Sequence, residues 1–291
     1  IAYNGIDVFG HHNTFTHNVI RDACTTKGDC GGVRTFGRDS LSQTAVHDLL
    51  FDENIIVNIT GNTDGCHPDY EALFGFGLYI DHYSRDVTVT GNTIISATVH
   101  GILFANATGT ISDNTLYNNS YTWPYNGGQV YIGGSPAYVT QHTGNILYGL
   151  SANAATLAAS PGRVSGSNHN TFFHPYRSQH IWSGSTYTLS AWQAASGQDA
   201  GSSEAWFTLN PGDPPRSRIF YNATGQTQVV DLGDTLYLDL DQNPVAGSLT
   251  LAPYSSRILI DSGLAADLAL ALTVAGATGT SAGATVTYTL H

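Results

Sequence analysis

The stretch Gly91-Asn92-Thr93-Ile94 decides the fold, because the same short element, an Asn followed by apolar or β-branched residues, recurs along the chain. The intervals between successive Asn residues are 36, 38, 22, 31 and 25. The shorter intervals are close to one coil of a parallel β-helix, and the longer ones indicate coils with inserted loops. We expect Asn at a sharp turn of each coil, because it tolerates left-handed backbone and its amide can hydrogen-bond to the next coil in a ladder. The other copies are His17-Asn18-Val19-Ile20, Glu53-Asn54-Ile55-Ile56, Asp113-Asn114-Thr115-Leu116, Gly144-Asn145-Ile146-Leu147 and His169-Asn170-Thr171-Phe172.

A second element, which precedes the Asn element in most coils, alternates as a strand with one buried face does. It occupies residues 5–9, 32–36, 77–81, 101–105 and 129–133, which should stack in register as one parallel sheet. The positions predicted to face the core are Ile6/Val8, Val33/Thr35, Leu78/Ile80, Ile102/Phe104 and Val130/Ile132. The outward positions form two columns, one of Asp7, Arg34, Tyr79, Leu103 and Tyr131, the other of Phe9, Phe36, Asp81, Ala105 and Gly133.

The predicted fold class is therefore all-β. A right-handed parallel β-helix (solenoid) over residues 1–200 is followed by a small antiparallel β-sandwich-like module over 201–262. We interpret residues 263–291 as a tail or the truncated start of a further β module. Insertions at 21–30, 57–74 and 117–127 all follow the Asn element, so they should rise on one side of the solenoid and wall a groove.

Composition limits the partners. Only 11% of residues are charged, the net charge is −12, and Lys27 is the single lysine. Nucleic acid and anionic membranes are therefore disfavoured partners, and no apolar stretch is long enough to insert into a bilayer. We expect a secreted or cell-surface protein that is a monomer.

Three cysteines, Cys24, Cys30 and Cys66, allow at most one disulfide within the chain. A bridge from Cys66 to Cys24 or Cys30 would pin two neighbouring loops together. Free buried thiols are the alternative.

One part of the sequence resembles a known group of proteins. The stretches that carry the resemblance are Gly77-Leu78-Tyr79-Ile80-Asp81 with Val87-Thr88-Val89-Thr90-Gly91-Asn92, preceded by Gly31-Gly32-Val33-Arg34-Thr35-Phe36-Gly37-Arg38-Asp39. Together they resemble the pectin-lyase-like β-helices of bacterial glycoside hydrolases and related polysaccharide-degrading enzymes. The resemblance covers about residues 1–200 and implies a catalytic carboxylate at Asp81. In those hydrolases a second Asp usually follows, and this chain has His82 there.

Hydrolysis of a glycosidic bond normally needs two carboxyl groups that flank it. The catalytic candidates are Asp81, with Asp39 as a second acid and His82 as an acid or base. Arg34 and Arg38 could hold a sugar carboxylate or form salt bridges to the acids, and the aromatic residues could stack on sugar rings or pack against loops. The predicted substrate-binding residues are Asp7, Arg34, Phe36, Arg38, Tyr79, Tyr83, Trp123 and Tyr131.

The histidines lack the close spacing of a zinc motif, so no metal site is expected, and Ca²⁺ is the one cofactor left open. The predicted function is a glycoside hydrolase that acts on a polysaccharide or oligosaccharide. Two alternatives stay open. One is a polysaccharide lyase that acts on a uronate-containing glycan, and the other is a non-catalytic glycan-binding or surface β-helix.

Overall fold

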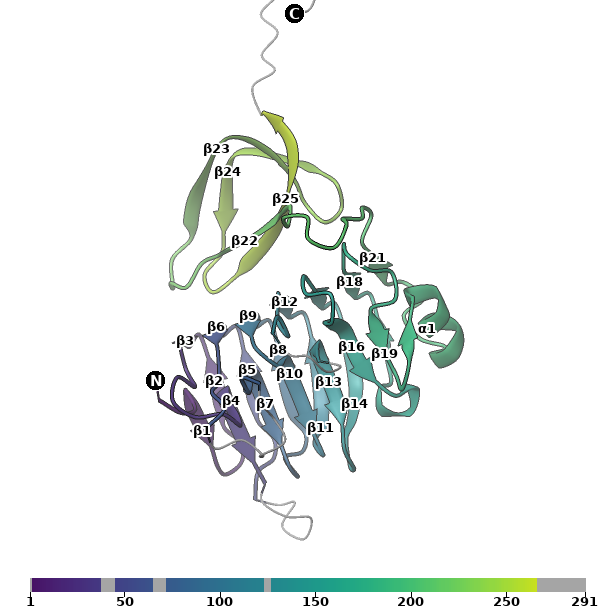
Figure 1. The fold of residues 1–291 in the computed structure, drawn as a ribbon. Coiled ribbons are helices and arrows are strands. Elements are labelled where there is room, and N and C mark those ends of the chain that lie inside the picture. The colour runs from purple at the N-terminus through teal and green to yellow at the C-terminus, as the bar shows by residue number, and fades with distance from the viewer. Residues whose placement is uncertain (1, 38–44, 65–71, 123–126, 266–291) are drawn as a thin grey trace, which may run out of the picture.

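The computed structural model describes residues 2–37, 45–64, 72–122 and 127–265 (Figure 1). Within these residues the chain is mostly β and contains three parallel sheets and one antiparallel sheet. The helical elements are the 3₁₀ turn η1 (Pro161–Arg163) and the helix α1 (Leu189–Ser196). No helix in the described ranges has both the length and the apolar character needed to cross a membrane.

The three parallel sheets are built from short strands taken in rotation along the chain. Sheet 1 consists of β1 (Ile6–Val8), β4 (Cys30–Phe36), β7 (Gly75–Asp81), β10 (His100–Ala105), β13 (Gly128–Gly133), β16 (Ala155–Ala159), β19 (Ile181–Trp182) and β20 (Thr186–Tyr187). Sheet 2 consists of β2 (Thr14–Thr16), β5 (Leu50–Asp52), β8 (Val87–Thr90), β11 (Thr108–Ser112), β14 (Tyr138–Thr143) and β17 (Ser167–Asn168). Sheet 3 consists of β3 (Val19–Arg21), β6 (Ile55–Ile59), β9 (Thr93–Ala97), β12 (Thr115–Tyr117), β15 (Ile146–Tyr148), β18 (Thr171–Phe173) and β21 (Ser203–Glu204).

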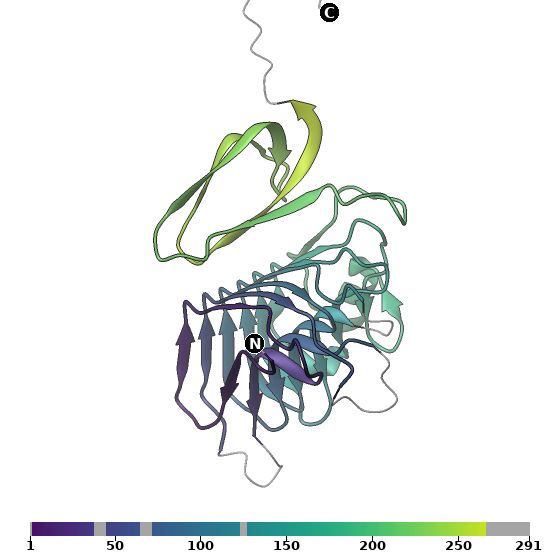
Figure 2. The same ribbon diagram turned by 60° about the vertical axis from the view of Figure 1, so that its left-hand side comes forward.

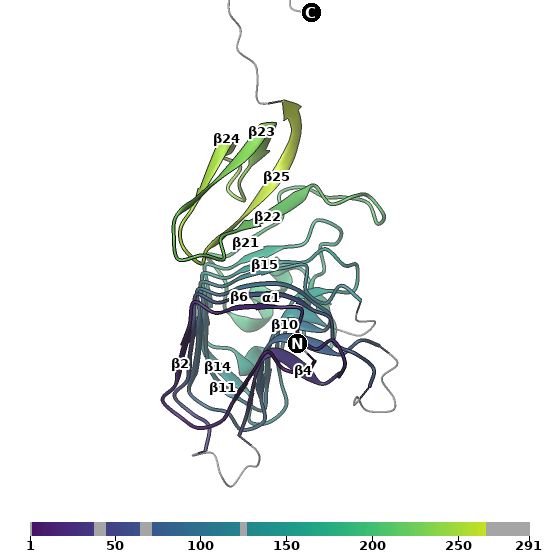
Figure 3. The ribbon, with the colours of Figure 1, turned by 90° about the vertical axis from the view of Figure 1, so that its left-hand side faces the viewer.

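We call one pass through a strand of each sheet a circuit. Successive circuits stack side by side, as Figures 2 and 3 show for the strands from β1 onward. The expected in-register parallel stacking of sheet 1 is confirmed, because Val33 pairs with Ile6 on one side and with Leu78 on the other. Only the last pair of sheet 1, β19 with β20, is antiparallel.

The core lies between the three sheets, and the side chains expected to face inward form part of it. Val33, Leu78 and Phe104 are at most 1% exposed. At the end of the stack α1 contributes Trp192 to the same core, and its indole Nε1–H donates to the carboxylate of Asp199 at 2.8 Å.

The Asn residues of the repeat form a continuous ladder, as expected. The side-chain Oδ1 of Asn92 accepts from the backbone N–H of Asn54 at 3.0 Å and from its Nδ2 at 2.8 Å. In the same way, Oδ1 of Asn114 accepts from the backbone N–H and from Nδ2 of Asn92, at 2.9 Å each. The ladder runs from Asn18 to Asn170 and ends where Asn170 Nδ2 donates to Asp199 Oδ1 at 3.0 Å.

The expectation that these Asn residues adopt left-handed backbone is wrong. The residue before each Asn takes the positive φ instead, for example 58° at His17, 56° at Asp113 and 69° at Gly144. The preceding residue makes the turn, and the Asn that follows keeps negative φ and projects its amide into the ladder. Buried amides are stabilised only when their donors and acceptors are paired, and this arrangement pairs them between circuits.

The module that follows is a single four-stranded antiparallel sheet, in which no second sheet of a sandwich is present among the described residues. Its strands are β22 (Ser217–Tyr221), β25 (Ser256–Ala265), β23 (Gln228–Leu238) and β24 (Pro244–Leu251), in that order. This sheet lies over the outer face of sheet 3 (Figure 1). Tyr148 and Phe173 of sheet 3 pack in one cluster with Ile258 and Ile260, so the contact is apolar.

The expected disulfide pairing is wrong. Cys24 bonds to Cys30, with Cα atoms 5.9 Å apart, so neither is a free thiol and neither can bridge to Cys66. The two cysteines are six residues apart in sequence and Cys30 is the first residue of β4, so closure of the short segment between them brings them together. Cys66 lies outside the described residues.

The ladder yields a first prediction. Asn114→Ala removes the acceptor for two donors of Asn92, so the free energy of unfolding should fall by about 3 kcal/mol. The control is Asn18→Ala, at the half-exposed first position of the ladder, where about 1 kcal/mol is expected. Urea denaturation measures both, and an equal loss in the two variants would contradict a cooperative ladder.

Three buried histidines should make stability depend on pH. Burial lowers the pKa of His100 to about 3 and that of His142 to about 4. Burial, followed by the charge of His180, lowers the pKa of His174 to about 3. Below the ordinary pKa of about 6.5 the unfolded chain binds protons that the folded chain does not. Stability is therefore complete above that pH and falls as the pH drops toward 4.

We expect each such histidine to contribute a slope of about 1.4 kcal/mol per pH unit within that window. His100→Asn keeps an acceptor near the position of Nδ1, which accepts from the Gly128 N–H at 3.1 Å. Its unfolding free energy, measured by urea titration between pH 7.5 and 4.5, should change less steeply than that of the parent. Exposed His169→Asn serves as the control, and an unchanged slope in His100→Asn would refute the prediction.

Candidate functional site

The outward columns of sheet 1 are present as the alternation predicts. Asp7 pairs with Arg34, Arg34 with Tyr79, and Tyr79 with Leu103, whose other neighbour is Tyr131. Asp81, the last residue of β7, pairs with Phe36 in the second column. Backbone pairing between neighbouring circuits therefore brings Arg34, Phe36, Tyr79 and Asp81 together.

The carboxylate of Asp81 is enclosed by its neighbours and is 1% exposed. Its Oδ2 accepts from Arg34 Nη2 at 2.8 Å and from Nε at 3.3 Å. Its Oδ1 accepts from the backbone N–H of His82 at 2.7 Å and contacts the imidazole Nδ1 at 2.6 Å. Asp81 therefore lies beneath the surface and positions two side chains that reach it.

The guanidinium of Arg34 is also fixed by contacts with neighbouring side chains. Its guanidinium carbon lies 5.1 Å from the centroid of the Phe36 ring and 5.3 Å from that of Tyr79. Burial alone would lower the pKa of Arg34, but the hydrogen bonds and charge of Asp81 outweigh it and raise that pKa. Of the two roles expected for Arg34, the geometry corresponds to the salt bridge.

Two aromatic side chains of the first outward column, Tyr79 and Tyr131, pack against neighbouring rings. Tyr79 is 7% exposed, its ring lies 4.4 Å from that of Phe76, and its hydroxyl donates to Asp29 at 3.1 Å. Burial and then the charges of Asp81 and Asp29 raise the pKa of Tyr79. Tyr131 stacks on His100 with ring centroids 4.6 Å apart. The partners Phe76 and His100 are themselves residues of sheet 1 strands, so these contacts lie within the sheet.

The accessible groups gather in the first three circuits. Phe9 is 68% exposed, Phe36 and Tyr83 are half-buried, and the side chain of His82 is 46% exposed. Asp7 is exposed and accepts from Asn4 Nδ2 at 2.7 Å. The surface formed by Asp7, Phe9, Phe36, His82 and Tyr83 is named the sheet 1 face below.

Three predicted site residues, Arg38, Asp39 and Trp123, lie outside the described residues. The same holds for Asp69 and Glu71 of the second insertion. Asp64, the other acidic residue of the second insertion, pairs with Lys27 at 2.8 Å and so joins the first two insertions.

The pairing of Asp81 with His82 has the chemistry of an acid–base dyad. When Nδ1 carries a proton it donates to Asp81, which fixes the tautomer and leaves Nε2 as an acceptor. Within the described part of the chain Nε2 makes no hydrogen bond, and the ring reaches solvent. His82 can therefore take a proton from a water molecule or hydroxyl on the sheet 1 face.

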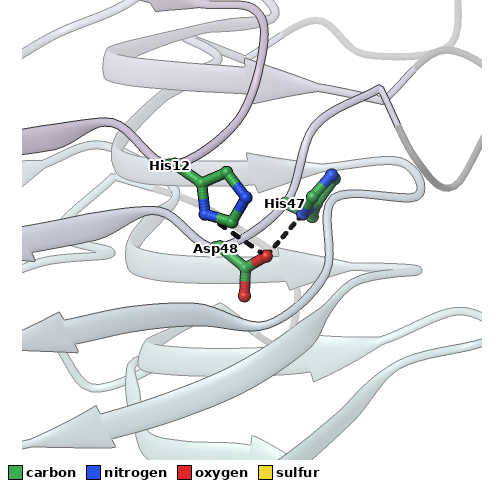
Figure 4. A group of neighbouring side chains, drawn as sticks. All are labelled: His12, His47 and Asp48. Atoms are coloured by element: carbon green, nitrogen blue, oxygen red, sulfur yellow. Dashed lines mark hydrogen bonds and ion pairs between the residues drawn. The ribbon is translucent and has the colours of Figure 1, made fainter.

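A second group lies at the turn between sheets 1 and 2 (Figure 4). His12, His47 and Asp48 each offer one ligand atom, and these atoms lie within 4.8 Å of one another. Motif spacing alone did not identify the group, because His12 and His47 are far apart in sequence. The signal was nevertheless present, since the first Asn interval of 36 places His12 against Asp48 and His11 against His47.

No protein-family model, no curated protein and no solved structure matches this chain.

The enclosed ion pair leads to a prediction about stability. Arg34→Leu leaves the buried Asp81 carboxylate without its cation, so the free energy of unfolding should fall by about 3 kcal/mol. Lys27→Leu is the matched control, because Lys27 pairs with Asp64 at 2.8 Å and both side chains are at least 49% exposed. The control should lose far less stability, because water screens an exposed pair, and equal losses in urea denaturation would contradict the enclosure of Asp81.

Proposed function

We propose that residues 1–200 form a right-handed parallel β-helix of the pectin-lyase-like kind, which binds a polysaccharide on its sheet 1 face and hydrolyses its glycosidic bonds. The rotation of strands through three parallel sheets supports the β-helix. So does the Asn ladder, which repeats once in each circuit. Secretion and a monomeric state belong to the same proposal, and the low content of charged residues agrees with it.

The observation that carries the proposal is the contact between buried Asp81 and half-exposed His82, at 2.6 Å. An imidazole held by a carboxylate is a general base suited to activating water near neutral pH. Asp81 itself is too enclosed to reach a substrate oxygen, because both of its oxygens already accept hydrogen bonds. His82 therefore takes a proton from the attacking water and returns it to the sugar oxygen that leaves when the glycosidic bond breaks, and Asp81 orients the imidazole.

The surroundings suit a glycan. Sugar rings combine an apolar face with hydroxyl groups, so a surface of exposed aromatic rings and a few polar groups recognises them. Phe9 and Phe36 supply ring faces, and Asp7 supplies a carboxylate that can accept from sugar hydroxyls. The Phe36 ring lies beside the proposed base, with its centroid 6.4 Å from that of His82, and Asp7 and Phe9 extend the face to the first circuit, two circuits from His82.

Hydrolysis fits this surface better than elimination. A lyase must neutralise the carboxylate of a uronate, usually with an arginine, a lysine or a metal ion. The guanidinium of Arg34 is already paired with Asp81, and the chain carries a net charge of −12. A neutral or weakly charged polysaccharide is therefore the proposed substrate.

The proposal predicts distinct behaviour for two variants. On the polysaccharide that the parent cleaves, His82→Gln should lower kcat by about 100-fold or more, because the amide cannot accept the proton. Asp81→Asn should also lower kcat, because it no longer holds the imidazole in the correct tautomer. Exposed His169→Gln should retain parental activity. Reducing-end release is the measurement, after circular dichroism confirms that each variant folds.

The products decide between the reaction classes. New reducing ends without ultraviolet absorbance from an unsaturated sugar would support hydrolysis. The presence of that absorbance would show that the reaction is an elimination. Binding to a glycan array without any cleavage would make the protein a non-catalytic binder. Full activity in His82→Gln would refute the role of His82.

A further inference from the structure

The turn between sheets 1 and 2 carries a cluster that the proposed function does not use. His12 lies between β1 and β2, and His47 and Asp48 lie just before β5 of the next circuit. The backbone N–H of His12 donates to the carbonyl of His47 at 3.1 Å, so the two turns are hydrogen-bonded directly. The three side chains lie close together on the outside of this turn (Figure 4).

The backbone fixes two of the three side chains at equivalent positions. His12 has a φ of 56° and Asp48 a φ of 52°, as expected if each makes the same turn in its own circuit. His47 is the least exposed of the three, with 15% of its side chain accessible. Its ring stacks on His11 with centroids 4.8 Å apart and an interplanar angle of 11°. His47 and Asp48 are therefore already oriented.

The distances suit a single metal ion. Asp48 Oδ2 lies 2.6 Å from His47 Nδ1 and 3.6 Å from His12 Nδ1. Around a tetrahedral zinc ion with bonds of about 2.0–2.1 Å, ligand atoms are about 3.3 Å apart. Small rotations of side chains bring all three atoms to that separation, and His12 is free to rotate because 66% of its side chain is exposed.

The donor set selects the kind of metal. Two imidazoles and one carboxylate favour borderline transition-metal ions such as Zn²⁺ over Ca²⁺ and Mg²⁺, which prefer oxygen ligands. Among the described residues, His11 and Arg85 are the other charged or titratable groups with a contact or electrostatic interaction at the cluster. Arg85 pairs with His47 through the backbone, and Asp86 follows it at an exposed position. The positive charge of Arg85 acts on Asp48 and opposes a bound cation, so the two imidazoles and the carboxylate must outweigh it.

We propose that His12, His47 and Asp48 form a zinc-binding site that joins the first circuit to the second. The three ligands leave the remaining coordination positions to water. Because the site forms only when the two turns are stacked, metal binding stabilises the folded chain.

The test uses the full chain, stripped of metal with a chelator, and Zn²⁺ as the probe. Calorimetric titration should show one bound Zn²⁺ per chain, and the melting temperature should rise by several degrees in excess metal. His12→Ala should lower the affinity at least about tenfold. Its metal-free melting temperature should fall only slightly, because the side chain is exposed but Ala is less favourable than His at a φ of 56°. Asp48→Asn should lower the affinity similarly, which provides a second variant.

The matched control is His17→Ala. His17 Nε2 lies 2.8 Å from Glu53 Oε2, so this pair also joins the first two circuits through an exposed His and a carboxylate, but no third ligand atom completes a group there among the described residues. Retained zinc affinity in His17→Ala supports the site. Three outcomes would overturn it: no zinc binding by the parent, undiminished binding by His12→Ala, or an equal rise in melting temperature with Ca²⁺.

Discussion

Hydrogen bonding between neighbouring circuits is the interaction on which the rest of this structure depends. Parallel pairing holds adjacent strands about 4.8 Å apart, and equivalent positions in successive circuits then form columns. The same spacing appears directly in the His11–His47 stack, at 4.8 Å between centroids. Columns of this kind bring together residues that are many positions apart in sequence, so the chemistry of the surface is set by which residue occupies which column.

On the sheet 1 face, burial decides which side chains reach solvent. Arg34 and Asp81 lie one circuit and two positions apart, a diagonal that their ion pair spans at 2.8 Å. Their enclosure beside Tyr79 removes the charged groups from solvent, and His82, bonded to Asp81, is the side chain of this group that reaches the surface. An acid that the alternation places outward can thus still be inaccessible, because the guanidinium and rings of adjacent circuits cover it.

Much of this could be predicted from the sequence, since period and register are local properties of the pattern. The recurring Asn and the alternation in residues 77–81 predicted the pairing of sheet 1 and the burial of Leu78 and Ile80. The disulfide could not be predicted in the same way, because Cys24 reaches Cys30 through the shape of one turn. The burial of Asp81 likewise depended on side-chain packing. The proximity of His12 and Asp48 could have been predicted, because the first Asn interval of 36, applied to the turn, pairs position 12 with position 48.

The Asn ladder also has a direction. Each amide donates through Nδ2 to the Oδ1 of the following circuit, from Asn18 through Asn145 to Asn170. The amide dipoles consequently align head to tail, so that partial positive charge accumulates at the α1 end of the stack, as it does at the N-terminus of a helix. There the terminal donor, Asn170, meets the carboxylate of Asp199, which is 1% exposed. Among the described residues this carboxylate accepts from neutral donors, namely the last amide of the row, the Trp192 indole and the hydroxyls of Ser167 and Ser202. The polarity of the row distinguishes one end of the stack from the other.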